Sequence, residues 1–97
     1  LEGTDKAVAT ALHRIVGEVA PHLEPKTWYG FPSYAREGKL IVFYQPASKF
    51  DTRYGTVGFQ EDARLDDGEM WATSFAVIEV TDAVEQRLRA LVAQAAG

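Results

Sequence analysis

The chain contains no cysteine, two histidines and one methionine among its 97 residues. Without cysteine it forms neither disulfide bonds nor thiolate metal sites, and it has no cysteine nucleophile. His13 and His22 are too few for a closed zinc site, which needs more nitrogen or sulfur ligands. We therefore expect both histidines at the solvent or at helix ends, no catalytic residue, and no resident cofactor.

Blocks of basic residues are absent, and the balance of charge is acidic. Ten Lys and Arg residues stand against fourteen Asp and Glu, which gives a net charge of −4. Because an acidic surface repels phosphate groups, we expect no nucleic-acid partner and no binding to anionic membranes.

Long apolar runs are absent as well. No stretch approaches the roughly 20 apolar residues that cross a bilayer, and Leu1–Asp5 is not typical of a signal peptide. The lack of cysteine suits a reducing compartment, so these features together predict a cytoplasmic protein.

The residues that are present are those of one folded domain. Hydrophobic residues make up 46% of the chain, and charged residues make up 25%. Neither a repeat nor a linker nor a low-complexity segment interrupts the sequence. We predict a single domain over residues 1–97.

Amphipathic helices are predicted near both ends of the sequence. The first covers residues 4 to about 20, with Thr4 or Asp5 as its N-cap. The second follows Thr81 or Asp82. Asp82 and Glu85 have the spacing of a capping box. The two apolar stripes repeat at spacings of three and four: Val8, Leu12, Ile15, Val16 and Val19 in the first helix, and Val84, Leu88, Leu91, Val92 and Ala95 in the second.

Between the helices, the pattern favours strands joined by short turns. Strands are predicted at 32–35, 39–45, 53–59 and 70–80, with a hairpin turn at Arg36-Glu37-Gly38. Gly55 and Gly58 suggest close approach of other backbone in the third strand. In the last strand we expect the side with small residues, such as Ala72 and Ala76, to lie under a helix.

Strands joined by short turns are antiparallel, and both helical stripes need a common apolar surface. The sequence therefore predicts an α+β fold, a two-layer sandwich. An antiparallel sheet of about four to five strands carries both terminal helices on one face. The other face is expected to carry aromatic residues and to form a concave surface or an oligomer interface.

An acidic loop is the first candidate site. Five carboxylates lie within nine residues, and oxygen ligands suit hard cations: Glu61, Asp62, Asp66, Asp67 and Glu69. The loop does not match an EF-hand, because Ala63 and Leu65 fall at ligand positions. The alternative reading is a solvated turn around Asp66-Asp67-Gly68.

Aromatic residues form the second candidate site. The densest group lies at 28–34, and with Trp71 it could bind a small molecule or peptide. The candidate residues are Trp28, Tyr29, Tyr34 and Trp71. The alternative is that most of these rings belong to the core.

An ordered set of short motifs runs from about residue 6 to the final helix: Tyr29-Gly30-Phe31-Pro32-Ser33-Tyr34, Gly38-Lys39, Leu40–Tyr44, Ser48-Lys49-Phe50, Thr52-Arg53-Tyr54, Gly58-Phe59, Leu65-Asp66-Asp67-Gly68 and Met70-Trp71. In these motifs the chain resembles the YdhG-like family of small bacterial domains of unknown function. The resemblance implies an α+β sandwich. Because some members are described as frataxin-like iron chaperones, it also implies iron binding.

We therefore expect a non-enzymatic binding domain, a monomer or a homodimer, with an unidentified protein or small-molecule partner. Iron binding through the acidic loop is one version, and ligand binding through residues 28–34 is the other. An enzyme with paired carboxylates stays open as a third hypothesis, because such pairing is spatial.

Overall fold

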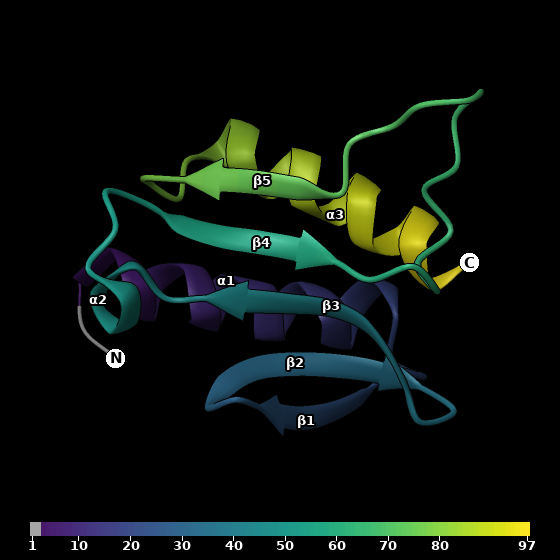
Figure 1. Ribbon diagram of the computed structural model, residues 1–97, viewed down its shortest axis with the longest axis horizontal. Helices are drawn as coiled ribbons and strands as arrows, with labels where there is room; N and C mark the ends of the chain where they lie inside the picture. The colour runs from purple at the N-terminus through teal and green to yellow at the C-terminus, as the bar shows by residue number, and fades with distance from the viewer. Residues whose placement is uncertain (1–2) are drawn as a thin grey trace.

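Two long helices pack on the same face of a five-stranded antiparallel sheet (Figure 1). Figure 1 shows the computed structural model, which describes residues 3–97. Leu1 and Glu2, the start of the segment Leu1–Asp5 that is not typical of a signal peptide, lie outside the described residues. The elements are α1 (Gly3–Val19), β1 (Glu24–Trp28), β2 (Phe31–Arg36), β3 (Lys39–Gln45), α2 (Ala47–Phe50), β4 (Gly55–Phe59), β5 (Ser74–Val77) and α3 (Asp82–Ala96). The predicted α+β sandwich is confirmed.

The strands follow one another in the sheet in chain order, β1-β2-β3-β4-β5, and every neighbouring pair is antiparallel. Two tight hairpins set the register of the first three strands. Glu37 and Gly38, with φ of 52° and 82°, confirm the expected turn between β2 and β3. Tyr29 and Gly30, with φ of 51° and 78°, form a matching turn between β1 and β2.

The sequence pattern did not predict the short helix α2 or the strand β1. Pro25 lies inside it, and most of its residues are exposed, so the alternation of a half-buried strand is missing. Proline is tolerated there because β1 is an edge strand. The aromatic segment after Thr27 is therefore part of the β1–β2 hairpin.

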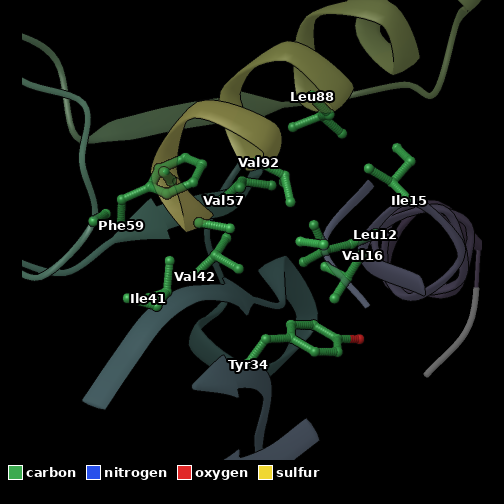
Figure 2. Close-up of a cluster of buried hydrophobic side chains, with 14 of the residues drawn as sticks. Leu12, Ile15, Val16, Tyr34, Ile41, Val42, Val57, Phe59, Leu88 and Val92 are labelled. Carbon is green, nitrogen blue, oxygen red and sulfur yellow. The ribbon is translucent and has the colours of Figure 1, made fainter. Parts of the chain in front are cut away.

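The core lies between the sheet and the two helices. Figure 2 shows side chains from both layers pointing toward one another: Leu12, Ile15 and Val16 from α1, Leu88 and Val92 from α3, and Tyr34, Ile41, Val42, Val57 and Phe59 from the sheet side. Six of these ten side chains are fully buried. Burial of one such side chain contributes about 1.5–3 kcal/mol, so the helical stripes hold the two layers together.

The helices α1 and α3 run parallel to each other. Arg14 pairs with Glu85, and four residues further along both helices Glu18 pairs with Arg89. These ion pairs are partly exposed, so they fix the alignment more than they stabilise the fold. The N-cap of α3 is Thr81, whose hydroxyl accepts from the Val84 N–H at 3.2 Å. Of the two predicted caps, Thr81 is confirmed, and the capping box of Asp82 with Glu85 was wrong because Asp82 already lies inside the helix.

The last strand is shorter than predicted, and its orientation is reversed. Phe75 and Val77 face the helices and pack with the core, whereas Ser74 and Ala76 are exposed. The small residues therefore do not lie under a helix, because α3 fills that space with Leu88 and Leu91, against which the larger side chains pack.

Two glycines of β4 make room for rings and not for backbone, contrary to the sequence-based expectation. A Cβ on Gly55 would lie 2.0 Å from the Tyr44 hydroxyl oxygen. A Cβ on Gly58 would lie 2.3 Å from Cζ of Phe43. Since Phe43 and Tyr44 are consecutive in β3, their rings cover opposite faces of the sheet.

Candidate functional site

Asp5 has the most deeply buried carboxylate of residues 3–97, and it accepts hydrogen bonds from other parts of the fold. It is only 6% exposed, although it lies in the first turn of α1. The Tyr44 hydroxyl donates to Asp5 Oδ1 at 2.6 Å. The backbone N–H groups of Ala47 and Ser48 donate to its two oxygens at 2.8 and 3.0 Å. The sequence-based expectation that Thr4 or Asp5 caps α1 was wrong, because both residues lie inside α1. The Asp5 carboxylate instead accepts from the first N–H groups of α2 and so caps that helix.

The electrostatics of Asp5 are those of a structural carboxylate. Burial raises the pKa of this carboxyl, but the hydrogen bonds from Tyr44, Ser48 and Ala47 outweigh burial and hold its pKa well below the ordinary value. Burial and the Asp5 carboxylate raise the pKa of Tyr44 above the ordinary value. Both groups keep one charge state near neutral pH, so this pair is poorly suited to proton transfer.

A cluster of rings lies on the sheet face opposite the helices. We call it the aromatic patch; it consists of Trp28, Tyr29, Phe31, Phe43 and Phe50. The Trp28 ring centroid lies 5.0 Å from that of Tyr29 and 5.3 Å from that of Phe43, both edge to face. Phe31 contacts Phe50 at 5.3 Å. These spacings are those of favourable aromatic pairs.

The aromatic patch is only partly covered. Tyr29 is 77% exposed and Phe50 47% exposed, whereas Phe31 is buried. Lys49 donates to the Tyr29 carbonyl oxygen at 2.9 Å and lies over the Phe31 ring at 5.3 Å. The ammonium therefore holds the β1–β2 turn against α2.

Beside the aromatic patch lies a hollow of about 300 Å³, which we call the carboxylate hollow. Trp28 forms part of its wall, and Glu61 and Asp62 bring two carboxylates to it. Lys39 Nζ approaches Asp62 Oδ1 to 4.0 Å. Arg36 Nη2 donates to the Asp62 carbonyl oxygen at 3.0 Å, which ties this loop to β2. Trp28 and two residues of the acidic loop, Glu61 and Asp62, thus meet in one place.

The remaining residues of the acidic loop lie elsewhere. Asp66 and Asp67 line a second hollow, of about 320 Å³, together with Trp71 and Arg87. Glu69 lines neither hollow. Within residues 3–97, no three His, Asp or Glu side chains are grouped closely enough to hold a metal ion.

The four aromatic candidates are also divided. Only Trp28 and Tyr29 share the aromatic patch. Tyr34 faces the helices, and its hydroxyl lies 3.1 Å from His13 Nδ1, a hydrogen-bond distance. Burial raises the pKa of Tyr34 above the ordinary value. Trp71 is 39% exposed and lies beside Phe75 and α3, at the β5 edge of the sheet.

Both histidines lie where the sequence predicts, one at the solvent and one at a helix end. His13 is exposed on α1. His22 Nε2–H donates to the Ala96 carbonyl oxygen at 3.2 Å, so it lies at the end of α3. Arg36 donates to the same oxygen at 2.7 Å. Neither histidine lies among the residues that line the two acidic hollows.

Comparison with known proteins gives no match: no family model, no curated protein and no solved structure is similar to the chain. Among the helices of residues 3–97, none has both the length and the apolar character of a transmembrane span.

Proposed function

We propose that the protein is a non-enzymatic, cytoplasmic binding domain that holds a small organic cation at the aromatic patch. The observation that carries this proposal is the position of Trp28, which belongs to the patch and also forms the wall of the carboxylate hollow. A ligand there contacts exposed rings with its apolar body and two carboxylates with its charged group.

The chemistry of the two parts is complementary to an amine. An indole face attracts a cation through its quadrupole, by about 0.5–1 kcal/mol at exposed sites. The Glu61 and Asp62 carboxylates add Coulomb attraction over a short distance. The protein's net charge of −4 favours approach of a cation from solution.

Part of the site is already fixed before a ligand arrives. The type of hairpin at Tyr29-Gly30 holds Trp28 opposite Phe31, and Arg36 anchors the backbone of Asp62. A fixed arrangement reduces the entropy lost on binding. Two internal cations compete with a ligand: the Lys39 ammonium lies near Asp62, and the Lys49 ammonium lies over the Phe31 ring.

A matched pair of probes tests the proposal. 2-Phenylethylamine and phenylacetate have the same ring and opposite charge. Titration of the ¹⁵N-labelled protein, followed at the Trp28 indole N–H, should show binding of the amine and much weaker binding of the acid. The double variant Glu61→Gln/Asp62→Asn should weaken amine binding about two- to fivefold or more, since each exposed charge contributes up to about 1 kcal/mol.

Asp66→Asn/Asp67→Asn is the control, because it removes the same charge from the other hollow. Equal binding of both probes, or an equal effect of the two double variants, would show that the carboxylate hollow does not select a cation.

Iron binding, implied by the YdhG-like resemblance, is the second candidate. It is favoured by the adjacent carboxylates Asp66 and Asp67, which line one hollow. An iron(II) titration under exclusion of oxygen tests it by NMR. Resonances of residues 61–69 should broaden selectively at millimolar iron, and uniform or absent broadening would remove this candidate.

A further inference from the structure

The two edges of the sheet are built differently. Strand β1 has Pro25 within it and charged neighbours at Glu24 and Lys26, all of which discourage pairing with another strand. Strand β5 at the other edge reads Ser-Phe-Ala-Val and has none of these protections apart from its short length. The structure therefore blocks one edge and leaves the other able to pair.

The free backbone groups of β5 can be assigned from the register. The Phe59 N–H donates to the Thr73 carbonyl oxygen at 2.8 Å, and Val57 lies opposite Phe75. Since hydrogen-bonding direction alternates along an antiparallel strand, Thr73, Phe75 and Val77 point their backbone groups toward β4. Ser74 and Ala76 consequently point theirs outward, to the open edge.

A groove lies directly beneath this edge, on the side of α3. We call it the β5 groove. It joins a hollow of about 340 Å³ to the hollow of about 320 Å³ that contains Trp71, since the two share Phe75, Arg87 and Leu91. Its apolar surface comes from Phe75, Val84, Leu88 and Leu91. The Arg87 guanidinium lies 5.5 Å from the Phe75 ring centroid and covers it.

The charges around the β5 groove indicate which occupant fits. Asp66 and Asp67 are exposed at the Ser74 end, beside Trp71. A second copy of the chain, paired β5 to β5, would place this end beside the Glu79 and Asp82 end of its partner. Acidic residues would then outnumber the basic groups at this contact, Arg53 and Arg87, and the excess of negative charge disfavours self-association. A basic group in the occupant meets the opposite charge instead.

We propose that β5 and the β5 groove bind an extended segment of a partner protein that adds a sixth strand to the sheet. The segment pairs its backbone with Ser74 and Ala76. Its alternate side chains are apolar and enter the groove. A Lys or Arg residue lies at the end that meets Asp66 and Asp67. This site is separate from the aromatic patch, so either site can exist without the other.

A random library of twelve-residue peptides, selected against the immobilised protein, is the probe. We expect enrichment of peptides with apolar residues at every second position and a basic residue toward one end. A selected peptide, synthesised and titrated into ¹⁵N-labelled protein, should shift the amides of Ser74 and Ala76 and the Trp71 indole N–H. The Trp28 indole N–H should stay in place.

Two variants at one position distinguish backbone pairing at the sheet edge from non-specific binding of the peptide. Ala76→Pro removes the outward N–H without removing a bond to β4, and should weaken peptide binding at least about tenfold. Ala76→Val keeps the N–H and should bind within about twofold of the wild type. Asp66→Asn/Asp67→Asn leaves the strand intact and should weaken binding about two- to fivefold, with a smaller dependence on salt.

Three outcomes overturn the proposal. The first is a selection that enriches no alternating pattern. The second is a peptide that shifts Trp28 and not Ala76, or that binds both Ala76 variants equally. The third is a concentration-dependent dimer, detected by sedimentation, that Ala76→Pro dissociates, because the edge would then serve self-association. If Ala76→Pro fails to fold, the paired aspartate variant decides the question.

Discussion

Asp5→Asn is the most direct test of how this fold is held together. The side chain keeps its size but loses its charge, and its new NH₂ group must face the Ser48 N–H or the Ala47 N–H. One of three charge-assisted hydrogen bonds is replaced by a conflict between donors, and the others are weakened. We expect a loss of about 2–4 kcal/mol in the free energy of unfolding.

That loss is large for a chain of this size. Domains are stable by about 5–15 kcal/mol, and 1 kcal/mol moves the Tm of a small domain by roughly 4–8 °C. The Tm of the variant should therefore fall by roughly 10 °C or more. Asp51→Asn is the matched control, because Asp51 is exposed with φ of 52°, a conformation that asparagine also tolerates. It should change stability by less than about 0.5 kcal/mol.

The pH dependence has a defined direction. The folded-state pKa of Asp5 lies below that of the unfolded chain, so its contribution is fully present above about pH 4. As pH falls further, the unfolded state binds the proton first and the wild type loses this contribution. The difference between wild type and Asp5→Asn should shrink below about pH 4.

Urea unfolding at pH 7, 4 and 2.5, followed by circular dichroism, measures both effects. A double-mutant cycle with Tyr44→Phe isolates the 2.6 Å hydrogen bond from the two backbone bonds. A cost below about 0.5 kcal/mol at pH 7, or a difference that widens in acid, would refute the structural role assigned to Asp5.

Three further substitutions test other parts of the molecule. Gly58→Ala forces Phe43 to move and should lower the free energy of unfolding by about 1–3 kcal/mol. Urea unfolding of this variant in a Trp71→Phe background, followed by Trp28 fluorescence, should show the lower stability and a changed spectrum of the folded state. Lys39→Gln removes the cation beside Asp62 and should raise the affinity for 2-phenylethylamine by up to about fivefold; an unchanged or lower affinity in the NMR titration contradicts the assigned competition. Thr81→Ala removes the side-chain cap of α3 and should cost about 1 kcal/mol in thermal unfolding, with Thr81→Ser close to the wild type.

The fold could be predicted from the sequence where periodicity is strong. The stripes of α1 and α3 repeat over several turns, and the Glu37-Gly38 turn has glycine at one of its two positive-φ positions. The edge strands were harder. Strand β1 has no buried face, and the predicted strand at 70–80 contains exposed residues outside β5, so only Ser74–Val77 joins the ladder.

The site could be predicted only in its parts. Composition identifies Trp28 and the acidic loop as unusual, but the two are more than thirty positions apart, and the folded sheet brings them together. The role of Asp5 had no local signal, because its partners lie in β3 and α2. A carboxylate near a helix start is ordinarily a cap, and tertiary contacts overrode that preference here.

The parallel arrangement of α1 and α3 has an electrical consequence. Each helix places a partial charge of about +0.5 at its start and −0.5 at its end, over a length of about 25 Å for α1. Neighbouring antiparallel helices cancel these fields, whereas these two add. Arg36 and Arg64 donate to the carbonyl oxygens of Ala96 and Gly97 where the negative ends gather. The two helices therefore contribute the sum of their dipoles to the domain, and Arg36 and Arg64 offset part of the negative end.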